Sequence, residues 1–157
     1  MRDPADIGGP ARAARLAGGV GRRPGPRDAA LREARVCYDH LAGVRGVRLH
    51  DAMVAQGVLV ATQDGIALSP AGRARLVAEG IDIAALDSRP RPLCRACLDW
   101  SERRPHLAGS LGAALLRHFI ARGWLRRDSA SRAVHVTPQG EAALAAFAAG
   151  PRRAGVG

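Results

Sequence analysis

Cysteine and histidine residues recur in two short motifs whose donor atoms suit a metal ion. The first motif is CYDH at 37–40, and the second is CLDW at 97–100, followed by a histidine nine residues after its cysteine. Two thiolates and two imidazoles make a donor set that tetrahedral zinc prefers. Because repeated units usually pack about a pseudo-twofold axis, the motifs predict a zinc site made of Cys37, His40, Cys97 and His106.

Three other interpretations of these residues stay open. Cysteine is among the most buried residue types and often packs as a small apolar side chain, and Cys94-x-x-Cys97 without a partner pair at zinc-ribbon spacing is a weak metal signal. Cys37 and Cys97 could instead respond to oxidants as redox-sensitive thiols. His40 and His106 open the same HLAG sequence, so they could also form local hydrogen bonds at that turn.

The acidic residues of these motifs do not predict an enzyme. Asp39 and Asp99 have no nucleophile or second acid at a set spacing, and each is expected on a helix, as a surface charge near Arg35 or Arg103. The glycines at 18, 19 and 21 do not precede a lysine, which the chain lacks entirely, so no phosphate-binding loop is predicted.

The basic residues are all arginine, and 24 arginines against 14 acids give a net charge of +10. Twelve arginines and four acids fall in residues 89–157, so this segment carries +8. The turn RRDSASR at 126–132 follows a predicted helix with two more arginines, and such groups contact DNA phosphates. We predict contacts to double-stranded DNA from Arg117, Arg122, Arg126, Arg127 and Arg132. A solvated basic face is the alternative.

Composition limits the remaining function classes. Aromatic residues make up only 3% of the chain, which disfavours a stacking platform for single-stranded nucleic acid. No apolar run approaches the roughly 18–20 residues of a membrane span, and the N-terminal sequence lacks the apolar core of a signal peptide. Three cysteines without an export signal predict reduced thiols in a cytoplasmic protein.

An internal repeat of about 60 residues organises the chain. Residues 40–59 match residues 106–125 at 9 of 20 positions without a gap. The predicted fold class is α+β, mostly α, with two tandem winged-helix-like units after a flexible arm. The predicted boundaries are a disordered arm over 1–27, a first unit over 28–87, a linker over 88–92, a second unit over 93–150 and a tail over 151–157.

Each unit is predicted in the order helix, helix, strand, wing, strand, helix. For the first unit, apolar spacing and turn residues predict helices over 28–43, 47–56 and 71–79, with strands over 58–60 and 66–68. Ser69 and Pro70 supply a hydroxyl N-cap and a proline at the first helical position. The predicted aromatic core consists of Trp100, Phe119, Trp124 and Phe147.

These motifs together resemble a known family. CYDHLAG at 37–43, CLDWSERRPHLAG at 97–109, GWL at 123–125 and the helix starts SPAG and TPQG are similar to the C-terminal portion of a group of ArsR-type winged-helix transcriptional regulators. The resemblance covers residues 31–149. In that family an N-terminal winged helix reads the operator, while the portion present here sets dimer geometry and responds to a signal. The resemblance therefore implies a truncated regulator, or a gene model that starts too late.

The predicted function is a DNA-binding transcriptional regulator of ArsR-like type, which forms a homodimer and retains the effector and dimerisation part. Two alternatives stay open. The first is a structural dimerisation or protein-interaction module that does not bind DNA, and the second is a metal- or redox-sensing module that uses Cys37 and Cys97. Apart from zinc, no cofactor is predicted.

Overall fold

A computed structural model describes residues 27–150 of the chain. The predicted disordered arm, up to residue 26, and the predicted tail over 151–157 lie outside the described residues. Among the residues that are described, no helix is long and apolar enough to cross a membrane.

The described chain contains two copies of the same succession: a β-hairpin, a long helix, a second hairpin (the wing) and a further helix. A short helix, α1 (Ala29–Glu33), precedes the first copy, and α4 (Ile83–Asp87) precedes the second. The first copy consists of β2 (Arg35–Cys37), β3 (His40–Ala42), α2 (Gly43–Ala55), β4 (Leu59–Thr62), β5 (Gly65–Leu68) and α3 (Pro70–Glu79). The second consists of β6 (Arg95–Leu98), β7 (Pro105–Ala108), α5 (Gly109–Ala121), β8 (Leu125–Arg127), β9 (Val134–Val136) and α6 (Pro138–Ala149).

The predicted helix over 28–43 is wrong beyond its first turn. Asp28 does cap a helix, but that helix ends at Glu33, and β2 and β3 form an antiparallel hairpin. Tyr38, within the predicted helix, lies at the hairpin turn with φ of 56°, and it is 85% exposed. Strand pairing instead buries Val36 and Leu41, and tertiary burial of these two residues outweighs a weak helical period.

Glycine begins each long helix, where the sequence predicted that Gly43 would end one. Gly43 has φ of 84°, and a Cβ there would lie 2.7 Å from the carbonyl oxygen of Arg32. Gly109 repeats this arrangement with φ of 81°. Because a residue with a side chain is strained in this conformation, glycine allows the strand to turn directly into the helix.

The predicted strands over 58–60 and 66–68 and the helix after them are confirmed in the first copy. β4 and β5 pair in antiparallel register with Thr62 opposite Gly65, so the two-residue turn between them is Gln63-Asp64. The Ser69 hydroxyl accepts a hydrogen bond from the amide of Gly72, Pro70 is the first residue of α3, and Gly80 follows its last residue. Thr137 caps α6 in the same way. These local signals were readable because they depend only on neighbouring residues.

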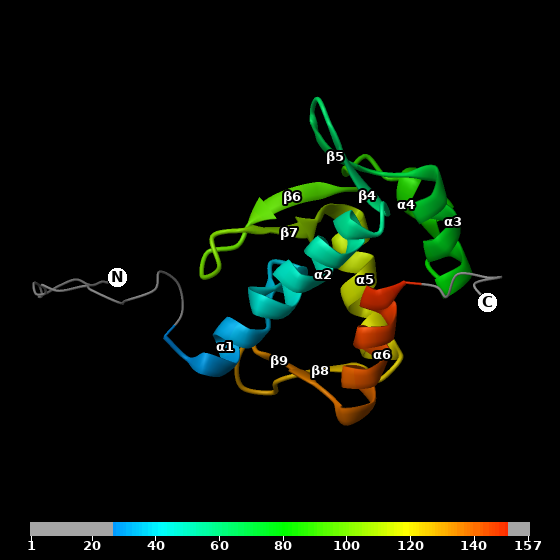
Figure 1. The fold of residues 1–157 in the computed structure, drawn as a ribbon. Helices are drawn as coiled ribbons and strands as arrows, with labels where there is room; N and C mark the ends of the chain where they lie inside the picture. The colour runs from blue at the N-terminus through cyan, green and yellow to red at the C-terminus, as the bar shows by residue number, and fades with distance from the viewer. Residues whose placement is uncertain (1–26, 151–157) are drawn as a thin grey trace, which may run out of the picture.

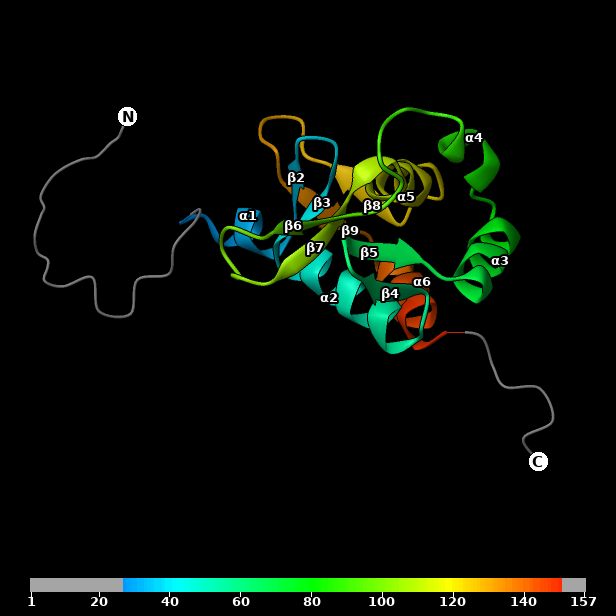
Figure 2. The same ribbon diagram turned by 90° about the horizontal axis from the view of Figure 1, so that it is seen from above.

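The two copies pack against each other and share one hydrophobic core. In Figure 1, α2 and α5 lie at the centre, with the β6–β7 hairpin over them and β8–β9 beneath. Each long helix packs against a strand of the other copy, α2 on β7 and α5 on β3. Figure 2 shows α1 at one end of the molecule and α3 and α4 at the other. Neither long helix is covered by its own copy alone.

The aromatic core is confirmed except at one position. Phe119, Trp124 and Phe147 are buried, and the ring centroids of Phe119 and Trp124 lie 5.3 Å apart. Trp100 is 59% exposed because it lies in the loop that joins β6 and β7. That the two copies are winged helices in the predicted sense stays a prediction.

The second wing is attached to the first copy. The amide of Val36 donates to the carbonyl oxygen of Arg132 at 2.9 Å, and the amide of Val134 donates to that of Ala34 at 3.0 Å. Strand β2 therefore lies between its own hairpin partner and the second wing.

Candidate metal centre and basic surface

Strand register places one cysteine and one histidine opposite each other in each first hairpin. Cys37 pairs with His40 between β2 and β3, and Cys97 pairs with His106 between β6 and β7. Directly opposite residues of an antiparallel pair present their side chains on the same face. The predicted placement of Cys37 and His40 on one helix is therefore wrong, but the two positions still share a face.

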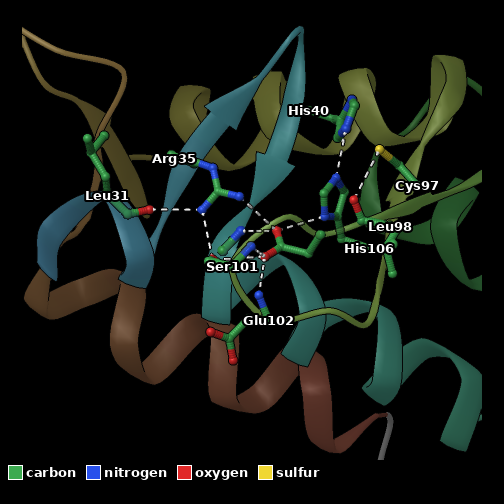
Figure 3. Close-up of polar contacts among 10 residues, drawn as sticks. Leu31, Arg35, His40, Cys97, Leu98, Ser101, Glu102 and His106 are labelled. Carbon is green, nitrogen blue, oxygen red and sulfur yellow. Dashed lines mark hydrogen bonds and ion pairs between the residues drawn. The ribbon is translucent and has the colours of Figure 1, made fainter. Parts of the chain in front are cut away.

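The two hairpins bring the four predicted ligands together. One donor atom from each of the four lies within 4.8 Å of every other: Cys37, His40, Cys97 and His106. The Nε2 atoms of His40 and His106 are 3.0 Å apart, and both rings are buried. Figure 3 shows the contact between the two rings, with Cys97 near them. The local HLAG hydrogen bonds considered for the histidines are replaced by this contact between copies. Metal binding by the cluster stays a prediction.

A carboxylate faces the other nitrogen of each histidine ring. The Nδ1 atom of His106 lies 2.9 Å from Asp99, and that of His40 lies 3.4 Å from Asp39. A neutral imidazole that donates from Nδ1 keeps its lone pair on Nε2. At 3.0 Å the two Nε2 atoms form a hydrogen bond when one ring carries its proton on Nε2, and a metal ion between the rings can replace that proton when both rings donate from Nδ1. Carboxylates in this position orient the histidine ligands of metal sites.

Asp99 is the centre of the polar network and was missed by the sequence analysis, which expected a surface charge. Its side chain is fully buried and accepts hydrogen bonds from the amide of Gly43 at 2.7 Å and that of Glu102 at 2.9 Å. The guanidinium of Arg35, also buried, lies 3.3 Å away (Figure 3). The recurrence of C-x-D in both copies is the signal that could have identified Asp99.

The electrostatics of the network favour a charged carboxylate beside neutral imidazoles. Burial by itself raises the pKa of Asp99, but the amides of Gly43 and Glu102 and the charge of Arg35 hold it below its usual value. Burial lowers the pKa of His106 to about 4 and also lowers that of His40. Both imidazoles are therefore neutral at pH 7, which is the form that binds metal.

The two copies differ at the equivalent aspartate. Asp39 is one-third exposed and accepts two hydrogen bonds from Arg91 of the linker, at 2.6 and 3.1 Å. An open pocket beside the cluster is lined by Tyr38, His40, Arg91 and Cys97, among others. The half-buried thiol of Cys97 therefore has a path to solvent, which a dissociable ion requires.

Cys94 is separate from the cluster, although it shares the C-x-x-C spacing with Cys97. It is not among the four residues whose donor atoms converge. Burial raises the pKa of its thiol to about 11, so it is a poor nucleophile at pH 7. The structural interpretation of the cysteines therefore fits Cys94.

The five predicted DNA-contacting arginines are all exposed, but they lie on different elements and one of them contacts other side chains. Arg126 and Arg127 lie on β8, and Arg132 lies in the wing turn. Arg122 instead lies 3.7 Å from Glu79 and stacks over Trp124, and Arg117 is on the one exposed side of α5.

Asp128 fixes the shape of the second wing turn. Its carboxylate accepts hydrogen bonds from the amide of Ala130 at 2.9 Å, the hydroxyl of Ser131 at 3.2 Å and the ring of His135 at 2.9 Å. These partners, His135 first, lower the pKa of Asp128 to about 2. The arginines around it are therefore presented on an ordered turn.

One comparison with known proteins gave a relative. Over 114 residues the chain is 38% identical to the uncharacterized HTH-type transcriptional regulator YdfF of Bacillus subtilis (strain 168). The match covers 73% of this chain and 50% of YdfF, so the chain spans about half the length of the relative. No protein-family model matches the chain, and no solved structure matches it.

Proposed function

We propose that this chain belongs to a DNA-binding transcriptional regulator of the ArsR type, and that residues 27–150 form its effector and dimerisation part. The observation that carries the proposal is the 38% identity to the transcriptional regulator YdfF over 114 residues. The net charge of +8 in residues 89–157 supports a polyanionic partner. The ArsR resemblance adds a homodimer, which sedimentation would detect as twice the 16.4 kDa chain mass.

DNA contact in this proposal comes from the second wing. Arg126, Arg127 and Arg132 are exposed on an ordered turn, where guanidinium groups can donate to phosphate oxygens. Base reading by the helix before the wing is disfavoured, because nine residues of α5 are buried, from Gly109 to Phe119. The described part of the chain therefore contacts the DNA backbone. When it acts alone, we expect a dissociation constant on the order of 10⁻⁴–10⁻⁶ M.

Fluorescence titration of the full chain onto duplex DNA at two salt concentrations tests this proposal. We expect binding that weakens steeply with salt and depends little on sequence. Arg126→Gln should weaken binding to all duplexes and reduce the slope of log K against log salt by about 1. Arg89→Gln removes one exposed charge from the linker instead and serves as the matched control.

Two outcomes would contradict the proposal. Absence of binding at low salt would favour the protein-interaction module that does not contact DNA. Equal losses in Arg126→Gln and Arg89→Gln would show that net charge matters and the second wing does not.

A further inference from the structure

We propose that Cys37, His40, Cys97 and His106 bind one zinc ion, and that this ion joins the two copies and steadies the second wing. The site goes beyond the proposed DNA contact, and its test does not depend on it. The donors are two thiols and two imidazoles, contributed equally by the two first hairpins.

The distances suit tetrahedral coordination. Zinc bonds of about 2.0–2.1 Å to nitrogen and 2.3 Å to sulfur place neighbouring ligand atoms roughly 3.3–3.8 Å apart. The four donor atoms of the cluster lie within 4.8 Å of one another, and the two Nε2 atoms are 3.0 Å apart. Separation of the two Nε2 atoms by a few tenths of an ångström, and a closer approach of the most widely spaced donors, would complete the coordination.

The surroundings are those of a metal site rather than of an apolar core. Both histidines have their Nδ1 atoms directed at carboxylates, which fixes the rings with Nε2 toward the centre. Asp99 is itself held by Arg35 and by backbone amides, so the His106 ring has little freedom to turn away. A pair of thiols that only filled space would not need two oriented imidazoles beside it.

The same hairpin connects the cluster to the wing. Cys37 is the last residue of β2, and the preceding residue, Val36, donates its amide to the carbonyl oxygen of Arg132 in the wing turn. A three-residue strand without a further anchor frays readily. A zinc ion on Cys37 would fix the end of β2, and through it the hydrogen bonds that hold the second wing.

Metal titration of the full chain tests the site. The protein is purified under reducing conditions, stripped with a chelator and titrated with Co²⁺, which is then displaced by Zn²⁺. We expect one equivalent of Co²⁺, with the visible absorption of tetrahedral cobalt and a thiolate charge-transfer band, both lost on addition of one equivalent of Zn²⁺.

Variants identify the ligands. Cys37→Ser and His106→Gln should each lower Co²⁺ affinity by more than about 100-fold, because loss of a ligand costs more than loss of an outer carboxylate. Asp39→Asn, which removes a half-buried outer partner, should lower it about tenfold. Cys94→Ser is the matched control, a cysteine change outside the cluster, and should keep full stoichiometry.

The outcomes divide cleanly. Absence of tetrahedral cobalt absorption in the reduced wild-type chain overturns the site even if every variant fails to fold. Unchanged affinity in Cys37→Ser also overturns it, as does lost binding in Cys94→Ser, which would indicate a C-x-x-C site instead. A Cys37–Cys97 disulfide in chain purified under reducing conditions, with no metal uptake, would overturn it in favour of a redox pair.

Hydrogen exchange tests the connection to the wing. Zinc should slow exchange of the Val36 and Val134 amides, which bond between β2 and the second wing, and the effect should vanish in Cys37→Ser. Equal exchange at both amides with and without zinc would overturn the role of the ion in steadying the wing.

Discussion

At the scale of single residues, Asp99 determines how the copies are joined. It is a fully buried carboxylate that contacts the first copy through Arg35 and the Gly43 amide, and the second through His106. The C-x-D motif in both copies marks the position of Asp99, but its role does not follow from the motif, because Arg35 and Gly43 lie 64 and 56 residues away in sequence. Burial of a charge is decided by tertiary contacts, which the C-x-D spacing does not contain.

Replacement of Asp99 should therefore be costly. Asp99→Asn keeps the volume but leaves the buried Arg35 guanidinium without its charged partner, and we expect a loss of about 3 kcal/mol in the free energy of unfolding. Urea denaturation of the full chain measures it. Asp39→Asn, whose carboxylate is one-third exposed, should cost less than about 1 kcal/mol. Similar losses in both variants would contradict the central role of Asp99.

At the scale of elements, the sequence predicted those helices, strands and caps that depend on residues close together in the chain. The strands on either side of the first wing turn and the cap at Ser69 follow from local chemistry, and both are confirmed. The helix over 28–43 failed because residues 35–42 pair with each other and with the second wing. Long-range strand pairing outweighs helical spacing there, and a single sequence gives little sign of it.

The second wing turn gives a prediction about pH. Hydrogen bonds from His135, Ala130 and Ser131 lower the pKa of Asp128 to about 2, below an unfolded value near 3.9. Its stabilising contribution is thus complete above about pH 4 and is lost as the pH falls through 2. The carboxyl carbon resonance of Asp128 in NMR titration should show a midpoint near 2. A midpoint at the usual value would mean that the turn is open in solution.

At the scale of the whole molecule, two copies close on each other through glycines at matching positions. A Cβ at Gly46 would lie 3.5 Å from the Cβ of His106, and one at Gly112 would lie 3.3 Å from the Cβ of His40. The 9 identities between residues 40–59 and 106–125 made the repeat readable. The packing of each long helix against a strand of the other copy could not be predicted. A repeat predicts similar units but does not say which surfaces they share.

Addition of a single methyl group where the two copies meet should lower the stability of the protein. Gly112→Ala places a Cβ 2.5 Å from the carbonyl oxygen of Leu107, so the helix must shift against the hairpins, and we expect destabilisation of about 2 kcal/mol. Gly57→Ala is the comparison, because no atom lies within 4 Å of its added Cβ, and only left-handed strain of about 1 kcal/mol remains. Thermal unfolding compares the two, and an equal or smaller loss in Gly112→Ala would contradict the close approach.

The reciprocal contacts of α2 with β7 and of α5 with β3 have the form of an isologous interface. The two copies thus meet within one chain as the subunits of a homodimer do, with the four sulfur and nitrogen donors gathered between them. Joining both copies in one chain makes that encounter intramolecular and independent of protein concentration. It also frees the halves to diverge, and they have: one aspartate is sealed in the core beside Arg35, while its counterpart, Asp39, faces the solvent and the linker.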